Sequence, residues 1–398
     1  MDELNSRIDA LIAHVRGVYG PGFVPLHRPV FAGRERDYVV DAIDSNFVSS
    51  AGQRVADFEA DVARFTGAAH AVATVNGTAA IHAALVLSGV EAGDEVITQP
   101  LTFIATCNAV SYCHARPVFV DVDEDTMGLS PEALRHFLET GTRQEGGVCV
   151  NRETGAVVRA CVPMHTFGLP LRIREVAELC AAHNVVLIED AAESLGSWVG
   201  DTHTGRFGRM GTLSFNGNKV ITTGGGGMIL TDDPELARAA KHLTTTAKVP
   251  HPYEFVHDRV GFNYRLPNLN AALGCAQMET LPAMQRIKAE VTQGYRELLP
   301  ELGFHLMEPI AGTRPNNWFN ALRLADLEER EAFLARTNDA GVMTRPVWRL
   351  MNTLPMFSAA QTVGVNGDGV ETAEWLEARI VNIPSSVPDA RIAEVVPS

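Results

Sequence analysis

The chain has 398 residues, of which 46% are hydrophobic and 20% are charged, a composition typical of a globular protein with a sizeable core. A net charge of −15 argues against a surface for nucleic acid or anionic membrane, because such surfaces need clustered cations. A phosphorylated ligand would therefore have to be held by a local device such as a helix N-terminus.

The first 24 residues predict an amphipathic helix, because apolar side chains recur at helical spacing: Leu4, Ile8, Leu11, Ile12 and Val15. Few cations lie on its polar face, so we expect a docking helix and no membrane insertion. The segment opens with acidic residues and does not resemble a signal peptide. The six cysteines form no C-x-x-C pair and no cluster with histidine, which predicts a reduced cytoplasmic protein without a metal site.

From residue 70 onward, strand-like and helical segments alternate. Seven short runs rich in β-branched residues are predicted strands: 70–75, 94–99, 116–122, 159–164, 184–190, 211–215 and 227–232. Helices are expected at 79–87, 103–112, from 130 onward, at 172–183 and at 234–243. This alternation predicts an α/β fold with a mostly parallel seven-stranded sheet flanked by helices. Residues 141–158 interrupt the pattern, and Glu153-Thr154-Gly155 predicts a hairpin turn there.

After residue 280 the alternation stops. A long helix is expected at 283–298, a strand at 319–324 and another helix at 326–339. We therefore expect an N-terminal helix at 1–24, a large domain at 25–280 and a smaller C-terminal α+β domain at 281–398.

Two adjacent acids end the buried strand in IEDAAES, at residues 188–194. Ligands of open α/β sheets bind beyond the carboxyl ends of the strands, so one of these acids is expected to face a site. An equally good interpretation is that Asp190 caps a helix, a position that aspartate favours.

A lysine and a glycine run follow in SFNGNK at 214–219 and TTGGGG at 222–227. A Walker loop is excluded because its lysine follows the glycines, and a Rossmann fingerprint is excluded because the first strand-to-helix turn reads V-N-G-T-A-A. Lys219 ends a predicted buried strand, which argues against a solvated surface lysine. Gly77 and Thr78 open the first helix and predict either a phosphate site or a simple helix cap.

A strand-end aspartate, a strand-end lysine and a Gly-Thr phosphate turn are together what pyridoxal 5′-phosphate (PLP) requires. On these features the chain resembles the DegT/DnrJ/StrS family of sugar aminotransferases, which have fold type I of the PLP enzymes, from about residue 25 to 384. It is most similar to the branch that makes legionaminic-acid-type amino sugars, through VSSAG, CVPMHTFG, EDAAESLGS, SFNGNK, TTGGGG, VGFNYRLPNLNAALG and MTRPVW.

The resemblance implies roles for individual residues. Lys219 would be the Schiff-base lysine, and Asp190 would pair with the pyridine nitrogen. The other implied PLP contacts are Phe103 on the ring face, Glu193 at the ring hydroxyl, Gly77, Thr78 and Ser214 at the phosphate, and Asn263 at the phosphate of the neighbouring subunit in a homodimer with shared sites. The implied substrate-binding residues are Ser49, Ser50, His165, Phe167 and Arg265. Trp348, in the Arg-Pro-x-Trp loop of the small domain, could close over the sugar or the donor carboxylate, or could equally be a clasp between domains. Gly225 stands where the family often has an acid, so no acid can act there.

The reaction that the resemblance implies is transfer of an amino group from L-glutamate to a nucleotide-linked keto-sugar. The branch favours UDP-4-keto-6-deoxy-N-acetylhexosamine, aminated at C4, with GDP as the alternative carrier. Three other functions were weighed. PLP-dependent sugar dehydratases have histidine in place of Lys219, an idle PLP- or sugar-binding relative would not need the intact set of Asp190, Lys219 and Phe103, and a nicotinamide dehydrogenase would need the missing glycine fingerprint.

Overall fold

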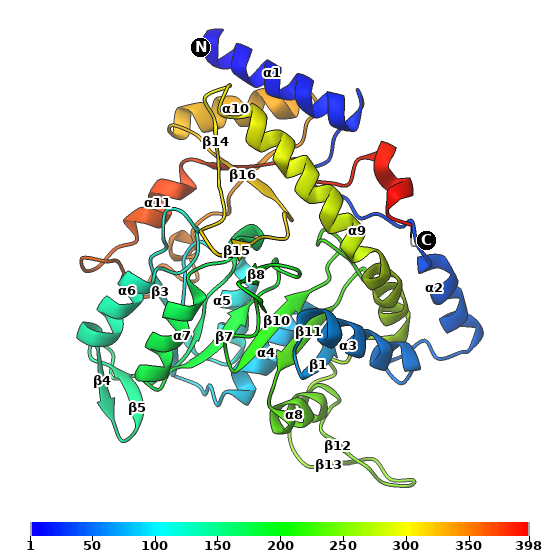
Figure 1. The fold of residues 1–398 in the computed structure, drawn as a ribbon. Helices are drawn as coiled ribbons and strands as arrows, with labels where there is room; N and C mark the ends of the chain where they lie inside the picture. Colours follow the sequence, from blue (N-terminus) through cyan, green and yellow to red (C-terminus); the bar gives the residue numbers. More distant parts are fainter. Residues whose placement is uncertain (1, 397–398) are drawn as a thin grey trace.

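The centre of the computed structural model, which describes residues 2–396, is an eight-stranded sheet (Figure 1). Its strand order is β1-β11-β10-β7-β6-β2-β3-β18. The strands are β1 (His70–Thr74), β2 (Glu95–Thr98), β3 (Arg116–Val120), β6 (Val158–Val162), β7 (Val186–Asp190), β10 (Met210–Ser214), β11 (Gly227–Thr231) and β18 (Thr362–Val363). Only the pairings of β11 with β1 and β10 are antiparallel among these described strands. The seven expected strands are confirmed. The eighth strand, β18, lies at the edge of the sheet and was not predicted from the sequence.

Helices cover the sheet where the alternating pattern predicts them. They are α4 (Gly77–Leu87), α5 (Ile104–Tyr112), α6 (Pro131–His136), α7 (Ile173–Ala182) and α8 (Pro234–Thr244). Local capping explains several starts: Asn76 and Ser130 each accept the N–H group three residues on, and Asp233 caps α8 with Pro234 in the first turn. The α/β fold class is therefore confirmed, with strand ends and helix N-termini meeting at one edge of the sheet.

The N-terminal helix α1 (Asp2–Tyr19) is docked through the apolar stripe that the sequence shows. Ile8, Leu11, Ile12 and Val15 are buried in a cluster shared with α9 (Asn268–Leu298) and α10 (Leu327–Asp339). The remaining helices are α2 (Glu35–Asp44), α3 (Gln53–Thr66) and α11 (Glu371–Glu377). No helix within residues 2–396 is both long and apolar enough to cross a membrane.

Helix α9 differs most from the sequence-based expectation. It begins at Asn268 and not at residue 283, and it continues through Pro282. Proline normally ends or kinks a helix, yet the chain stays helical on both sides of Pro282. Because α9 crosses residue 280 and β18 returns to the large sheet, the division into 1–24, 25–280 and 281–398 stays a prediction.

A second sheet lies beside the far half of α9. Its order is β14 (His305–Leu306), β16 (Asn320–Arg323), β19 (Ile380–Ile383) and β17 (Arg345–Pro346), all antiparallel. The expected strand at 319–324 and helix at 326–339 correspond to β16 and α10. In Figure 1 this sheet and α10 lie above the edge of the large sheet where β7 and β10 end.

Three small antiparallel sheets complete the described part of the fold. In 141–158 the paired strands are β4 (Thr142–Glu145) and β5 (Val148–Asn151), which turn at Gly146 and Gly147. The expected turn at 153–155 follows as a second, wider turn closed by a bridge between Val150 and Val157. The others are β15 (Thr313–Arg314), β8 (Trp198–Val199) and β9 (Thr202–His203), and the hairpin β12 (Lys248–Val249) with β13 (Val256–His257), which extends away from the body (Figure 1).

Candidate active site

A cavity of about 360 Å³ lies beyond the carboxyl ends of β7 and β10. Its walls come from both sheets and from the N-termini of α4 and α5. The lining residues are Asn76, Gly77, Thr78, Ile81, Phe103, Ala105, Thr106, Met164, Asp190, Ala192, Glu193, Ser214, Asn216, Asn218, Lys219, Trp318, Phe319 and Trp348. The structure therefore brings together eight of the expected site residues: Gly77, Thr78, Phe103, Asp190, Glu193, Ser214, Lys219 and Trp348.

Asp190 is the acid of β7 that faces the cavity. Neighbouring side chains on a strand point to opposite faces, so Glu189 faces the other way. Thr106 donates a hydrogen bond of 2.6 Å to one Asp190 oxygen, and the Ala192 N–H donates one of 3.1 Å to the other. Burial raises the pKa of Asp190, and the Thr106 hydrogen bond opposes this rise. The chain forms turns and no helix over residues 191–197, directly after Asp190, so the helix-cap interpretation is wrong.

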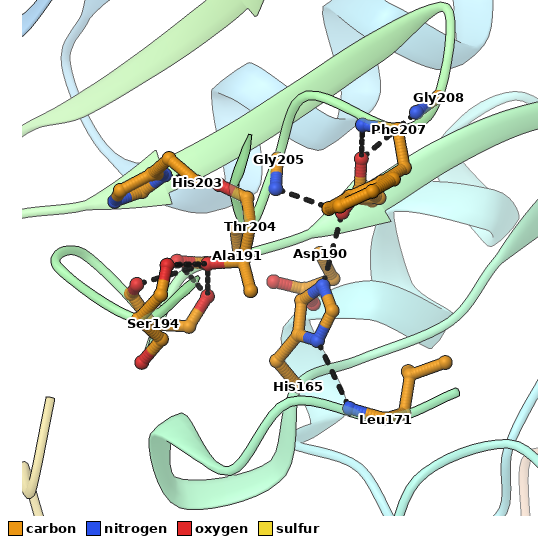
Figure 2. Close-up of polar contacts among 12 residues, drawn as sticks. His165, Leu171, Asp190, Ala191, Ser194, His203, Thr204, Gly205, Phe207 and Gly208 are labelled. Carbon is orange, nitrogen blue, oxygen red and sulfur yellow. Dashed lines mark hydrogen bonds and ion pairs between the residues drawn. The ribbon is translucent and has the colours of Figure 1, made fainter. Parts of the chain in front are cut away.

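Glu189 is a structural anchor on the opposite face of β7. Its carboxylate accepts the N–H groups of Gly205, Phe207 and Gly208 and lies 3.0 Å from Nε2 of His165. His165 is fully buried, and its Nδ1 accepts the Leu171 N–H (Figure 2). His165 therefore does not line the cavity of this chain, because both ring nitrogens are engaged behind the strand, and its expected place at the substrate pocket stays a prediction.

Lys219 and Glu193 form an ion pair inside the cavity. Nζ of Lys219 lies 3.1 Å from Oε1 of Glu193 and 4.0 Å from the ring centroid of Trp318. The second Glu193 oxygen accepts the N–H of Phe167 at 2.9 Å. Burial raises the pKa of Glu193 to about 7, and the charge of Lys219 opposes this rise. Glu193 can therefore hold or release a proton near neutrality beside an amine.

The other end of the cavity is built to receive an anion. The first N–H groups of a helix have no acceptors within the helix, and α4 directs this end, with Gly77 and Thr78, into the cavity. Ser214 ends β10 beside it: a Cβ on Gly77 would lie only 3.0 Å from the Ser214 Cβ. Glycine at position 77 therefore lets the helix terminus and the Ser214 hydroxyl approach the same ligand.

Four expected substrate residues lie outside this cavity. Phe167 is buried behind Trp348, with the two ring centroids 4.7 Å apart. The guanidinium of Arg265 is engaged by Glu59 at 2.5 Å, with both side chains largely buried. Ser49 and Ser50 are exposed in the loop that precedes α3. Phe167 is engaged by packing and Arg265 by an ion pair, and the predicted contacts of all four residues with substrate stay predictions.

Asn263 is exposed and lies outside the cavity of its own chain, bridged by backbone to Thr245. Its predicted contact involves a second subunit, so it stays a prediction.

Comparison with known proteins identifies the chain. Residues 30–396 match the model of the DegT/DnrJ/EryC1/StrS aminotransferase family. The chain belongs to this family. It is 36% identical over 84% of both chains to EpsN of Bacillus subtilis, provisionally named a pyridoxal phosphate-dependent aminotransferase, and 34% identical to GDP-perosamine synthase of Caulobacter vibrioides over 90% of this chain and 91% of the relative. The crystal structure of DesI with its TDP-sugar product has a TM-score of 0.78 and 25% identity, covering 94% of this chain and 91% of that one.

This DegT/DnrJ/EryC1/StrS protein is accordingly a sugar aminotransferase of fold type I whose cofactor is PLP. The cavity fits that cofactor by its donor set: helix N–H groups and a hydroxyl for a phosphate, a buried carboxylate for a protonated ring nitrogen, and a lysine. Phe103, at the start of α5, lines the cavity with 49% of its surface exposed, which leaves an aromatic face free for stacking.

Other lining residues of this aminotransferase were missed by sequence reasoning. Thr106 lies three residues after Phe103, and Asn218 lies inside SFNGNK, so proximity to these expected site residues could have suggested both. Trp318 and Phe319 lie about 100 residues beyond Lys219 in sequence, and no local pattern links them to it. Only the docking of the second sheet against the first brings them to the cavity.

Proposed function

We propose that this aminotransferase transfers the amino group of L-glutamate to C4 of a nucleotide-linked 4-keto-6-deoxy sugar, with UDP-4-keto-6-deoxy-N-acetylhexosamine as the first candidate. The observation that carries the proposal is the meeting of Lys219, Asp190 and an anion-binding helix terminus in one cavity. The similarity to GDP-perosamine synthase and to DesI with its TDP-sugar product supports a nucleotide-linked sugar, and it makes GDP and TDP the alternative carriers.

Bound PLP supplies the electron sink for the carbanion that forms when the substrate carbon loses its proton. The phosphate is held by the α4 N-terminus and the Ser214 hydroxyl. Asp190 stays charged against the ring nitrogen, since a buried carboxylate needs a cationic partner and Thr106 already favours its ionised form. The amine of Lys219 would be the base that accepts the proton lost by the substrate carbon and later gives it up again.

Glu193 assists Lys219 in this proposal. Its Oε1 is close enough to the amine to hold the ammonium between the two proton transfers. Since burial raises its pKa to about 7, Glu193 gains or loses a proton near neutral pH with a small change in its surroundings. Trp348 and Phe319 would border the sugar on the side of the second sheet.

The proposal includes a cytoplasmic homodimer in which Asn263 of one chain reaches the phosphate held by the other. Asn263 follows the β12–β13 hairpin, where Tyr253 and Phe255 are 83% and 82% exposed. Large exposed aromatic side chains on a projecting hairpin favour an interface, because isolated chains rarely leave such surface in water.

The test is a substrate panel. Purified holoprotein is incubated with L-glutamate and matched UDP-, GDP- and TDP-linked 4-keto-6-deoxy sugars, and 2-oxoglutarate and the amino sugar are quantified. We expect stoichiometric 2-oxoglutarate and a 4-amino product with the UDP sugar as the best substrate. Loss of water from the sugar without amine transfer would instead identify a dehydratase. Amine transfer to the GDP sugar alone would show that UDP is the wrong carrier, while the proposal of an aminotransferase would remain correct.

A further inference from the structure

A buried network links the two sheets directly behind Lys219, and Trp318 is at its centre. The indole N–H of Trp318 donates a hydrogen bond of 2.7 Å to the carbonyl of Asn218, the residue before Lys219. The face of the same ring lies 4.0 Å from Nζ of Lys219. One side chain thus contacts both the peptide that carries the lysine and the lysine amine.

Trp318 is itself fixed on both sides of its backbone. The backbone N–H of Trp318 donates a hydrogen bond to Oδ1 of Asn316. The backbone carbonyl of Trp318 accepts hydrogen bonds from Nζ of Lys288 at 3.2 Å and from the hydroxyl of Ser385 at 2.6 Å. Lys288 is only 2% exposed on α9, and its other acceptor is the Ser385 carbonyl. Burying a lysine against neutral carbonyls costs free energy. We therefore attribute the presence of Lys288 to a specific role, which is to hold the backbone at Trp318, just before β16.

Asn316 extends the same network to the second partner of Lys219. Its amide donates hydrogen bonds to the carbonyls of Glu193 at 2.8 Å and Leu195 at 3.0 Å. The side chain is 2% exposed, and a Cβ on Gly168 would lie 2.1 Å from its Oδ1, so the fit around it is tight. The carboxylate and the indole that contact Lys219 are therefore held in one rigid unit.

We propose that Trp318 is a positioning residue for Lys219. Its N–H holds the Asn218–Lys219 peptide in place, and its ring receives the lysine amine as an ammonium whenever the amine is free. Lys288 and Asn316 keep Trp318 in this position. The inference rests on the proposed role of Lys219, and it concerns neither the choice of sugar nor the nucleotide.

The ring and the N–H can be separated by substitution. Trp318→Phe keeps an aromatic face and removes the hydrogen bond to Asn218, whereas Trp318→Leu removes both. A neutral hydrogen bond corresponds to a change of about threefold to tenfold, and an added cation–π contact to about a further threefold to thirtyfold. Trp375→Leu is the matched control, because Trp375 lies on α11 outside the cavity and contacts Arg323 and Arg379 instead.

Two measurements test the inference. In the PLP-free protein, the rate at which Lys219 captures added PLP is followed by absorbance and by borohydride trapping, together with hydrogen exchange of the 214–221 segment. In the loaded protein, the single-turnover reaction with L-glutamate gives a limiting rate and a glutamate Kd. Capture in the PLP-free protein needs no sugar and no amino donor, so it is independent of whether the proposed reaction is correct.

We expect slower capture, faster exchange at 214–221 and a lower limiting rate in the order wild type, Trp318→Phe, Trp318→Leu, with the glutamate Kd within twofold. Trp375→Leu should match the wild type in all of these. Capture and limiting rates within twofold of wild type in both Trp318 variants would overturn the proposal. A raised glutamate Kd with unchanged limiting rates would also overturn it, since Trp318 would then act on the substrate. If Trp318→Leu fails to fold, Trp318→Phe must still show slower capture for the proposal to stand.

Discussion

Replacement of Lys288 by methionine should remove a specific pH dependence of stability. Lys288 is buried on α9, and burial lowers its pKa from 10.5 to about 7. Its hydrogen-bond acceptors are the carbonyls of Trp318 and Ser385, and no ion pair to it is found among residues 2–396. The nearby titratable side chain is His27, whose pKa burial and the charge of Lys288 hold well below 6.5, so His27 stays neutral through the range of interest.

The direction of the effect follows from proton binding. The unfolded chain keeps a proton on this lysine up to about pH 10.5, whereas the folded chain releases it from about pH 7 upward. Between these values the unfolded state binds more protons, so the free energy of unfolding rises with pH. At about 1.4 kcal/mol per pH unit, the contribution between pH 7 and pH 9 is about 3 kcal/mol. Below pH 7 Lys288 is protonated in both the folded and the unfolded chain, so the folded state carries the full cost of burying the charge.

The assay is urea unfolding of the PLP-free protein followed by fluorescence at pH 6, 7, 8 and 9. From pH 6 to pH 9, the free energy of unfolding of the wild type should rise by about 3 kcal/mol more than that of Lys288→Met. Methionine is the chosen replacement because it retains most of the buried aliphatic volume. Lys241→Met, at an exposed lysine on α8, is the control that should leave the wild-type dependence intact. Parallel pH profiles for wild type and Lys288→Met would refute the reasoning, since Lys288 would then titrate alike in both states.

Other substitutions test the remaining parts of the site. Asp190→Asn should retain PLP but lower turnover by orders of magnitude, because the ring nitrogen loses its counter-charge; near-native turnover would contradict this role. Thr106→Val removes a hydrogen bond that lowers the pKa of Asp190, so the acidic limb of the pH–rate profile should move up by about one to two units. Lys219→Ala should abolish borohydride trapping of PLP, and label appearing on another lysine would disprove the assignment. Mixing Lys219→Ala subunits with Asn263→Ala subunits should restore activity through one intact shared site, and no recovery despite subunit exchange would exclude sharing.

The parts of the fold that sequence could predict are those determined by local periodicity. The seven strands of the large sheet and the helices between them follow from apolar runs and capping residues that act over a few positions, as Asp233 and Pro234 do at α8. Pro282 shows where this reasoning fails. Its effect on helix α9 is outweighed by packing along the buried face of that helix, which no local rule contains.

The candidate site likewise contains residues that the sequence could predict and residues whose side-chain direction it could not. Asp190, Ser214 and Lys219 could be predicted because Asp190 and Ser214 end the parallel strands β7 and β10, Lys219 follows β10 in the next turn, and such strand ends converge at one edge of the sheet. His165 and Phe167 do not line the cavity, although they belong to a motif that lies next to it. Family motifs mark a segment and not the direction of each side chain, and here the segment turns these two rings inward, toward Glu189 and Trp348.

The position of Trp318 explains why the second sheet belongs to the chemistry and not only to stability. Glu193 follows a strand of the large sheet and Trp318 precedes a strand of the small one, yet both contact the amine of Lys219. Asn316 joins them through a buried hydrogen bond, so a displacement of one sheet relative to the other would move the indole and the carboxylate together. The lysine therefore keeps both neighbours if the sheets shift slightly.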